Sequence, residues 1–193
     1  MPWRKNRDPY RILVSEFMLQ QTQVKTVIPY YKNWIKSYPT IKKLAATSES
    51  KVLKNWQGLG YYTRARNLRN SAIQIQKKYA GKIPDSLKEI QKLPGVGRYT
   101  AGAVLSIAYG KKVPVVDGNV KRVLSRLFLL RENGAYKKSE NKLWDTMETL
   151  LPEKNCGDFN QAFMELGATI CLPKKPICIE CPLKKLCEAK LSK

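Results

Sequence analysis

Four of the five cysteines lie close together in the chain, at Cys171, Cys178, Cys181 and Cys187, with the pattern C-x6-C-x2-C-x5-C. Thiolates at this spacing can surround one metal centre. A zinc ribbon has two C-x2-C pairs separated by a longer span. This chain has one such pair, and it contains no histidine to complete a mixed zinc site. The pattern therefore favours a 4Fe–4S cluster bound by four cysteines, with zinc and a pair of disulfides as the alternatives.

The disulfide alternative requires an oxidising compartment. The first ten residues, MPWRKNRDPY, contain no apolar h-region of an export signal, so the sequence predicts a cytoplasmic rather than a secreted protein. Cys156 lies outside the cysteine pattern, and we expect it to be an ordinary structural or surface thiol.

Glu16 is the only charged residue in the segment ILVSEFML at 12–19. Helical spacing puts it four residues after Ile12 and three after Leu13, on the apolar stripe. A carboxyl group there loses solvation, which raises its pKa and lets it hold a proton near neutral pH. Glu16 is thus a candidate general acid. The alternative is a tolerated glutamate at the edge of the stripe.

Asp117 stands in VVDGN at 115–119, at the start of an expected helix. Aspartate is among the best helix N-cap residues. A capping carboxylate is also rigid and ionised, as electrostatic stabilisation or nucleophilic attack requires. Both interpretations can hold together.

Residues 86–109 predict a helix, a tight turn at 93–97 (LPGVG) and a second helix. The glycines allow unusual backbone angles, and Val96 between them can enter the core. Peptide N–H groups at the start of the second helix, beside Arg98, then form an anion site suited to a DNA phosphate. This pattern is typical of a helix-hairpin-helix. An ordinary turn between two helices is the alternative.

Two further segments carry side chains that can enter a base stack. QQTQ at 20–23 supplies amides, and GLGYYTRAR at 58–66 supplies aromatic rings beside arginines. Such groups can fill the gap that an extruded base leaves. The tyrosines could equally be core residues.

The charge balance indicates the kind of partner. The chain has 36 Lys and Arg against 15 Asp and Glu, a net charge of +21 among 193 residues. A polyanion is the simplest explanation, although lysine enrichment also follows from a thermophilic or AT-rich source. Because the basic residues are spread along the chain and no apolar run reaches membrane-span length, nucleic acid is favoured over a membrane.

The elements that position these residues are predicted to be helices throughout. Asp8 and Pro9 begin the first helix as N-cap and first residue. No segment alternates apolar and polar residues long enough for a strand. The fold class is therefore all-α, with a cysteine loop at its C-terminal end. Further helices are expected at 24–37, 40–47, 49–57, 64–79, 86–92, 98–109, 117–129, 137–151 and 158–170.

These motifs together resemble the endonuclease III superfamily of helix-hairpin-helix, iron–sulfur DNA glycosylases, and within it the MutY-type adenine glycosylases. The resemblance extends over residues 2–188. It rests on ordered matches, namely PWR (2–4), SEFMLQQTQV (15–24), GLGYYTRARNL (58–68), LPGVGRYTAGA (93–103), VDGNVKRVL (116–124), FNQAFMELGA (159–168) and the cysteine loop.

The resemblance implies a two-lobed helix-hairpin-helix DNA glycosylase fold with a 4Fe–4S cluster loop. A six-helix lobe at 8–113 would contain the helix-hairpin-helix at 86–109. Residues 1–7 and 114–193 would form the cluster lobe. Glu16 and Asp117 would face each other across a DNA groove. The C-terminal domain by which MutY-type enzymes inspect 8-oxoguanine is expected to be absent.

The resemblance also assigns roles. Glu16 would protonate the purine, Asp117 would stabilise the oxocarbenium-like sugar or briefly bond to it, and Asn119 would help to orient the site. Trp3, Arg4 and Gln161 would line the base pocket. Residues that contact DNA would be Gln20, Gln21, Thr22, Tyr61, Leu93, Gly95, Val96, Gly97 and Arg98, with Gln21 and Tyr61 inserting at the lesion.

Tyr99 occupies the position at which bifunctional members carry a lysine that forms a Schiff base. A phenol cannot form this imine, so a monofunctional glycosylase with little lyase activity is expected. It would remove adenine opposite guanine or 8-oxoguanine in double-stranded DNA, as a nucleoid-associated monomer that hands its product to downstream repair proteins. The alternatives are a thymine or uracil glycosylase for T·G mismatches, a bifunctional lyase, and a non-catalytic iron–sulfur DNA-binding protein.

Overall fold

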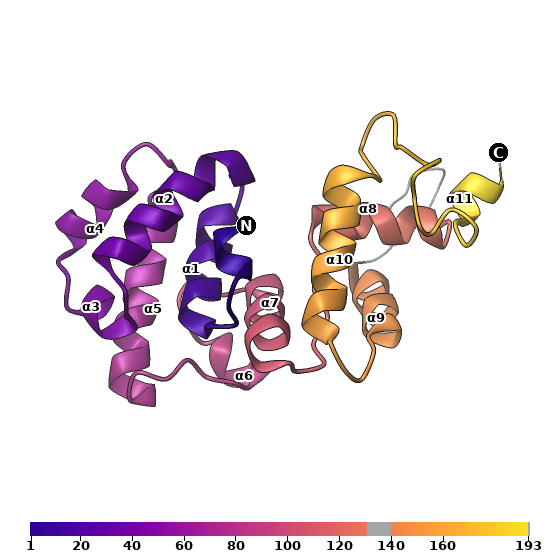
Figure 1. The fold of residues 1–193 in the computed structure, drawn as a ribbon. Coiled ribbons are helices and arrows are strands. Elements are labelled where there is room, and N and C mark those ends of the chain that lie inside the picture. Colours follow the sequence, from indigo (N-terminus) through magenta and orange to yellow (C-terminus); the bar gives the residue numbers. More distant parts are fainter. Residues whose placement is uncertain (131–139, 193) are drawn as a thin grey trace. The chain divides into compact units, whose positions relative to one another are not determined.

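A computed structural model describes residues 1–130 and 140–192. The chain divides into two compact units, Met1–Tyr109 and Gly110–Lys193. All regular secondary structure in the described residues is helical, which confirms the predicted all-α class (Figure 1). No helix among the described residues is long and apolar enough to span a bilayer.

The first unit, which the structure describes completely, has seven α-helices, one for each range predicted up to residue 109 and one more than the six-helix lobe that the resemblance implied. Its elements are η1 (Pro2–Arg4), α1 (Pro9–Leu19), α2 (Val24–Ser37), α3 (Ile41–Ala45), α4 (Glu49–Trp56), α5 (Thr63–Tyr79), α6 (Leu87–Ile90) and α7 (Arg98–Tyr109).

Helix α1 is the centre of the first unit. Its Asp8 cap accepts a hydrogen bond from the Arg11 backbone N–H at 2.8 Å, and Pro9 occupies the first turn, as predicted. The apolar run from Ile12 to Met18 is buried against α2, α5 and α7. Because α1 has neighbours on several sides, even its polar residues in this run lie in the interior.

Aromatic packing joins α2 to α4. The Trp34 and Trp56 rings meet edge to face, with centroids 5.3 Å apart, and both side chains are at most 1% exposed. Tyr38 packs against Trp34 in the same way, at 4.8 Å. This cluster fixes the end of α4, from which the GLGYYTRAR segment begins.

The observed units differ from the predicted lobes at residues 1–7. Trp3 is 5% exposed, and its ring lies 5.2 Å from that of Tyr31 on α2, so this segment packs within the first unit. The first unit ends at Tyr109 rather than at residue 113. The sequence does not specify which apolar surface buries a tryptophan near a terminus. In the structure this surface includes Tyr31 of α2.

In the second unit the described residues form α8 (Gly118–Leu127), α9 (Glu140–Leu150), α10 (Cys156–Thr169) and α11 (Glu188–Leu191). The start predicted for α9, at 137, lies outside the described residues. Asn160 on α10 is fully buried; its Oδ1 accepts from the Val115 N–H at 3.2 Å, and its Nδ2 donates to the Val113 carbonyl at 2.9 Å. This amide holds the extended segment that leads into α8.

Candidate functional site

Two of the predicted DNA-contacting segments, QQTQ and the hairpin turn, meet at the end of α1. A Cβ added to Gly95 would lie 2.9 Å from Phe17 Cε1 and 2.8 Å from Asn67 on α5, so the hairpin turn fits directly against these helices. The Gln20 amide also donates to the Thr100 hydroxyl of α7 at 3.5 Å. The first unit therefore gathers the QQTQ segment and the hairpin on one side of the core.

Glu16 lies one turn before this junction. Its side chain is 5% exposed and lies within the buried run of α1. This agrees with its predicted position on the apolar stripe of the helix. Burial penalises the charged form of a carboxyl group. Its location therefore meets the first requirement for a general acid.

The hairpin turn has the geometry expected of an anion site. Leu93 and Val96 are buried, at 2% and 5% exposure, and anchor the turn in the core. Gly95 has φ +75°, the left-handed region that favours glycine. Gly97 and Arg98 are exposed where α7 begins, so the start of this helix is accessible from solvent.

Gln21 and Tyr61, the two residues predicted to insert at the lesion, are exposed and have positive φ angles. Tyr61 is 62% exposed with φ +48°, and Gln21 is exposed with φ +56°. The Thr22 hydroxyl donates to the Gln20 carbonyl at 3.4 Å and helps to close the turn after α1. Few non-glycine residues adopt these angles, and such outliers often cluster at functional sites.

In the second unit, Asp117 caps α8. Its Oδ1 accepts from the Val120 N–H at 2.7 Å, and its Oδ2 accepts from the Asn119 amide at 3.0 Å. The N-cap interpretation is therefore confirmed, and the carboxylate is held in one orientation.

Arg122 extends this arrangement and was not among the predicted site residues. Its guanidinium donates to Asn119 Oδ1 at 2.9 Å, to the Gly167 carbonyl at 2.7 Å and to the Cys171 carbonyl at 2.7 Å. Gly167 allows the close approach, because a Cβ there would lie 2.6 Å from that of Asn119. The spacing of Asn119, Arg122 and Arg126 by three and four residues was the available signal, since it puts all three on one helix face.

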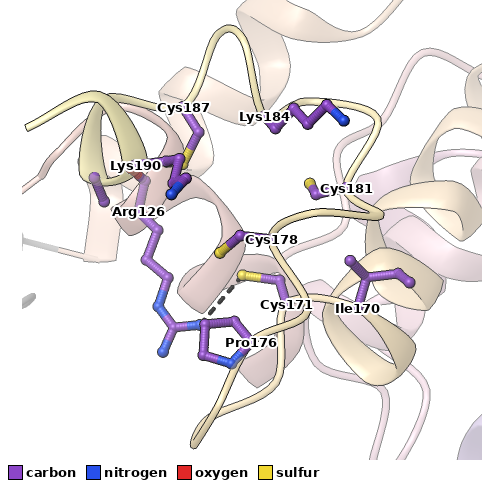
Figure 2. A pocket seen from close by; sticks show the side chains of 10 residues that line it. Arg126, Ile170, Cys171, Pro176, Cys178, Cys181, Lys184, Cys187 and Lys190 are labelled. Atoms are coloured by element: carbon purple, nitrogen blue, oxygen red, sulfur yellow. Dashed lines mark hydrogen bonds between the residues drawn. The ribbon is translucent and has the colours of Figure 1, made fainter. Parts of the chain in front are cut away.

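The four predicted metal ligands surround one cavity of about 210 Å³, and Figure 2 shows their sulfurs directed toward a common space. Arg126 donates to Cys171 Sγ at 3.3 Å, and Lys184 and Lys190 also line the cavity. Within 1–130 and 140–192, no three Cys, Asp or Glu side chains form a group that could hold a single metal ion.

Cys156 has a different environment. It is fully buried, and its thiol donates to the carbonyls of Gly110 and Lys111 at 3.1 and 3.0 Å. It is therefore a structural thiol within the second unit, one of the two roles expected from the sequence.

The remaining predicted residues are divided between the units. Trp3, Arg4 and Tyr99 belong to the first unit, and Gln161 lies on α10 of the second, where its amide donates to the Gly157 carbonyl at 3.3 Å. The joint base pocket and the facing of Glu16 and Asp117 stay predictions.

Comparison with known proteins gives a consistent result. Residues 14–149 match the HhH-GPD superfamily of base excision DNA repair proteins. The chain is similar to the adenine DNA glycosylase of Buchnera aphidicola subsp. Acyrthosiphon pisum (strain APS), with 48% identity over 193 residues, which are 100% of this chain and 55% of that protein. The chain spans about half the length of the curated relatives it matches first.

Solved structures share the fold. A thermostable thymine-DNA glycosylase superposes with a TM-score of 0.90 and 36% identity, covering 100% of this chain and 89% of that one. Endonuclease III in a trapped covalent intermediate with DNA superposes with a TM-score of 0.83 and 27% identity. This match covers 96% of this chain and 85% of that one. Together with the helix-hairpin-helix of the first unit, these matches show that the chain belongs to the HhH-GPD superfamily of base excision DNA repair proteins.

Proposed function

We propose that the chain is a monofunctional DNA glycosylase that removes adenine mispaired with guanine or 8-oxoguanine by hydrolysing the N-glycosidic bond. The observation that carries the proposal is 48% identity with an adenine DNA glycosylase over all 193 residues. The placement of Glu16 and Asp117 supports it, because the two carboxyl groups occupy environments that suit different roles.

Glu16 acts as the general acid. Adenine leaves poorly as an anion, so a ring nitrogen has to be protonated as the bond to the sugar breaks. A carboxyl group buried within α1 favours its protonated form and can donate that proton. The resulting carboxylate can then accept a proton from the attacking water.

Asp117 acts on the sugar. Its carboxylate accepts hydrogen bonds from the Val120 N–H and the Asn119 amide, which hold it in one orientation at the start of α8. A fixed negative charge stabilises the positive charge that develops on the sugar, by the logic of glycoside hydrolysis with two carboxyl groups. Asn119 orients the carboxylate through its 3.0 Å bond.

The product is an abasic site in an uncut strand. Tyr99 carries a phenol, which cannot attack the sugar to form an imine, so the strand should remain intact after base release. Gln161, Trp3 and Arg4 are assigned to the base pocket by the resemblance.

Double-stranded DNA carrying a mismatch or lesion is the proposed substrate. The net charge of +21 and the exposed start of α7 suit phosphate contacts that do not depend on sequence. Gln21 and Tyr61, both exposed, would fill the gap when adenine is extruded, at a cost of a few kcal/mol that is lowest at a mismatch. We propose that the chain acts as a nucleoid-associated monomer and passes abasic sites to downstream repair proteins.

We propose a 4Fe–4S cluster as the cofactor. An all-cysteine donor set suits it, and the cavity of about 210 Å³ has several times the roughly 30 Å³ that one water occupies. Cys171, Cys178, Cys181 and Cys187 would hold the cluster, while Arg126 donates to the Cys171 sulfur. When bound, the cluster would supply a covalent cross-link that stabilises the loop.

Thymine removal from T·G mismatches is the second candidate. The thymine-DNA glycosylase with a TM-score of 0.90 has the same fold, which shows that this scaffold also serves another base. Adenine is favoured because the identity with the adenine enzyme is 48%, against 36% for the thymine enzyme.

Single-turnover base release tests the proposal. Duplexes with A·8-oxoG, A·G, T·G or U·G would be treated with hot alkali to reveal abasic sites, with an untreated lane for lyase cutting. We expect adenine release that is lost in Glu16→Gln, and no cutting without alkali. Thymine release alone would move the protein to the second candidate. No release from any duplex, despite binding, would leave a non-catalytic DNA-binding protein.

A further inference from the structure

Arg64, the second residue of α5, is a buried arginine at the junction of the two proposed inserting segments. Its side chain is 6% exposed, although most basic residues of this chain face solvent. It lies in register with the buried stripe of α5, which includes Leu68 and Ala72 four and eight residues later. A charged residue in such a position needs partners for its donors.

The first set of partners is the C-terminal end of α1. The guanidinium Nη1 donates to the Met18 carbonyl at 2.8 Å, to the Phe17 carbonyl at 3.3 Å, and also to the Gln20 carbonyl. The last carbonyls of a helix have no intrahelical partner and carry the negative end of its dipole. Arg64 therefore caps the C-terminal end of α1, the helix that contains Glu16. One of the carbonyls that it binds belongs to Gln20, the residue before Gln21.

The second set of partners is the loop that carries Tyr61. The guanidinium donates to the carbonyls of Leu59 at 3.2 Å, Gly60 at 3.1 Å and Tyr61 at 3.4 Å. Its carbon lies 5.3 Å from the Trp56 ring centroid and 5.4 Å from that of Tyr61. One side chain thus binds both segments at once.

The chemistry of these contacts is specific to arginine. Burial lowers the pKa of the Arg64 guanidinium, yet an arginine stays charged at neutral pH. Its five N–H donors form a flat fork that can reach several carbonyls and lie over an aromatic ring. A lysine keeps the charge but has three donors on one nitrogen, and it cannot bridge the two segments in the same way.

Both segments need such a restraint. Gln21 and Tyr61 have φ values of +56° and +48°, which non-glycine residues adopt only when their surroundings impose them. Each directly follows a residue whose carbonyl Arg64 binds, Gln20 and Gly60 respectively. Restraint of these carbonyls fixes the peptide planes from which the two exposed side chains project.

We propose that Arg64 is the positioning residue that holds Gln21 and Tyr61 ready for insertion into DNA, and that it thereby sets the rate of base extrusion. This proposal rests on the proposed function, because it assigns Gln21 and Tyr61 to the gap left by the extruded base. Arg64 itself does not contact the base or the sugar in this scheme.

The test compares Arg64→Lys with Arg66→Lys in the full chain. Arg66 lies on the same helix, is exposed and pairs with Glu49 at 3.0 Å, so it controls for a change of basic residue on α5. Stopped-flow fluorescence of 2-aminopurine opposite guanine reports extrusion, and single-turnover adenine release from A·G is measured in parallel. For Arg64→Lys we expect both rate constants to fall roughly 10- to 100-fold, the scale that misplacement of a group can cost.

The same experiment separates positioning from folding. A variant that merely folds less well would lose fluorescence amplitude at an unchanged rate constant, and that result would overturn the proposal, as would extrusion at the wild-type rate. Arg66→Lys should keep the wild-type rate constants. If wild-type protein extrudes 2-aminopurine but releases no base from any duplex, the proposed function is wrong. The fluorescence rate constants of wild-type protein and Arg64→Lys still test the role of Arg64 in that case.

Wild-type protein supplies a second test that does not depend on a variant. Hydrogen exchange of free protein should show protection of the Thr22 and Leu59 amides, which donate to the Leu19 and Trp56 carbonyls at 3.2 and 3.0 Å. Arg64 binds the neighbouring carbonyls of Gln20 and Leu59 and so keeps both turns closed before DNA binds. Exchange of these amides at the unprotected rate would contradict the proposal.

Discussion

Both compact units contain arginines whose guanidinium groups bind backbone carbonyls of the same unit, but the surroundings of these arginines differ. In the first unit, Arg64 binds carbonyls within a packed interior in which Trp56 and Phe17 are fully buried. In the second, Arg122 and Arg126 bind carbonyls and a sulfur of the cysteine loop. The first arrangement is supported by apolar packing, whereas the second has little of it.

The cysteine loop illustrates this difference. Two of its apolar residues, Ile179 and Leu186, are 79% and 69% exposed, so they contribute little burial. A segment without a core needs covalent cross-links or a bound metal to remain ordered. The first unit should therefore keep its structure under changes that disorder the loop.

The largest expected effect is the loss of the metal centre. We expect Cys181→Ser to release bound iron, since it removes one of the four thiolates that line the cavity. Limited trypsin digestion should then cleave the loop at Lys184 and Lys185, while the first unit stays resistant. Equal resistance of variant and wild-type loops, with iron absent from both, would remove the cluster from the proposal.

The next effect concerns catalysis in the first unit. Glu16→Gln should lower single-turnover base release by about 10²- to 10⁴-fold, the usual contribution of a general acid. The change is nearly isosteric, so α1 should stay folded and the affinity for a mismatched duplex should be retained. Release at the wild-type rate would mean that another group protonates the base.

The helices of the first unit could be read from the sequence to a large extent. The segments predicted at 24–37 and 98–109 coincide with α2 and α7, because clear apolar periodicity and adjacent turn residues define their ends. The cap at Asp8 and the hairpin turn at Gly95 were also predictable, since each depends on the local requirements of one residue type.

What the sequence did not reveal is the inward orientation of particular basic residues. In a chain with 36 Lys and Arg, a single arginine gives no sign that its partners are carbonyls from distant segments. Arg64 binds Met18, 46 residues away, and Arg122 binds Cys171, 49 residues away. Such partners depend on tertiary packing, which local patterns do not encode.

A third effect compares two glycines of the hairpin turn. Gly95→Ala should destabilise the first unit by about 1–3 kcal/mol, because its Cβ would press on Phe17 and Asn67 and its φ is +75°. Gly97→Ala is the matched control, since nothing lies within 4 Å of the added Cβ and its φ is not left-handed. Urea unfolding of both variants measures the difference. Equal stability would show that the turn relaxes without cost.

The smallest effect is expected at a surface ion pair of the second unit. Lys112 and Glu153 approach to 2.5 Å, but their side chains are 41% and 82% exposed, so solvent screens the attraction and ordering two flexible chains offsets it. Glu153→Gln should change the free energy of unfolding by about 0–1 kcal/mol in urea titrations of the iron-loaded protein. Arg122 and Arg126 donate part-buried hydrogen bonds to Cys171 of the loop. A loss beyond this range would mean that exposed charges, rather than these hydrogen bonds, stabilise the second unit.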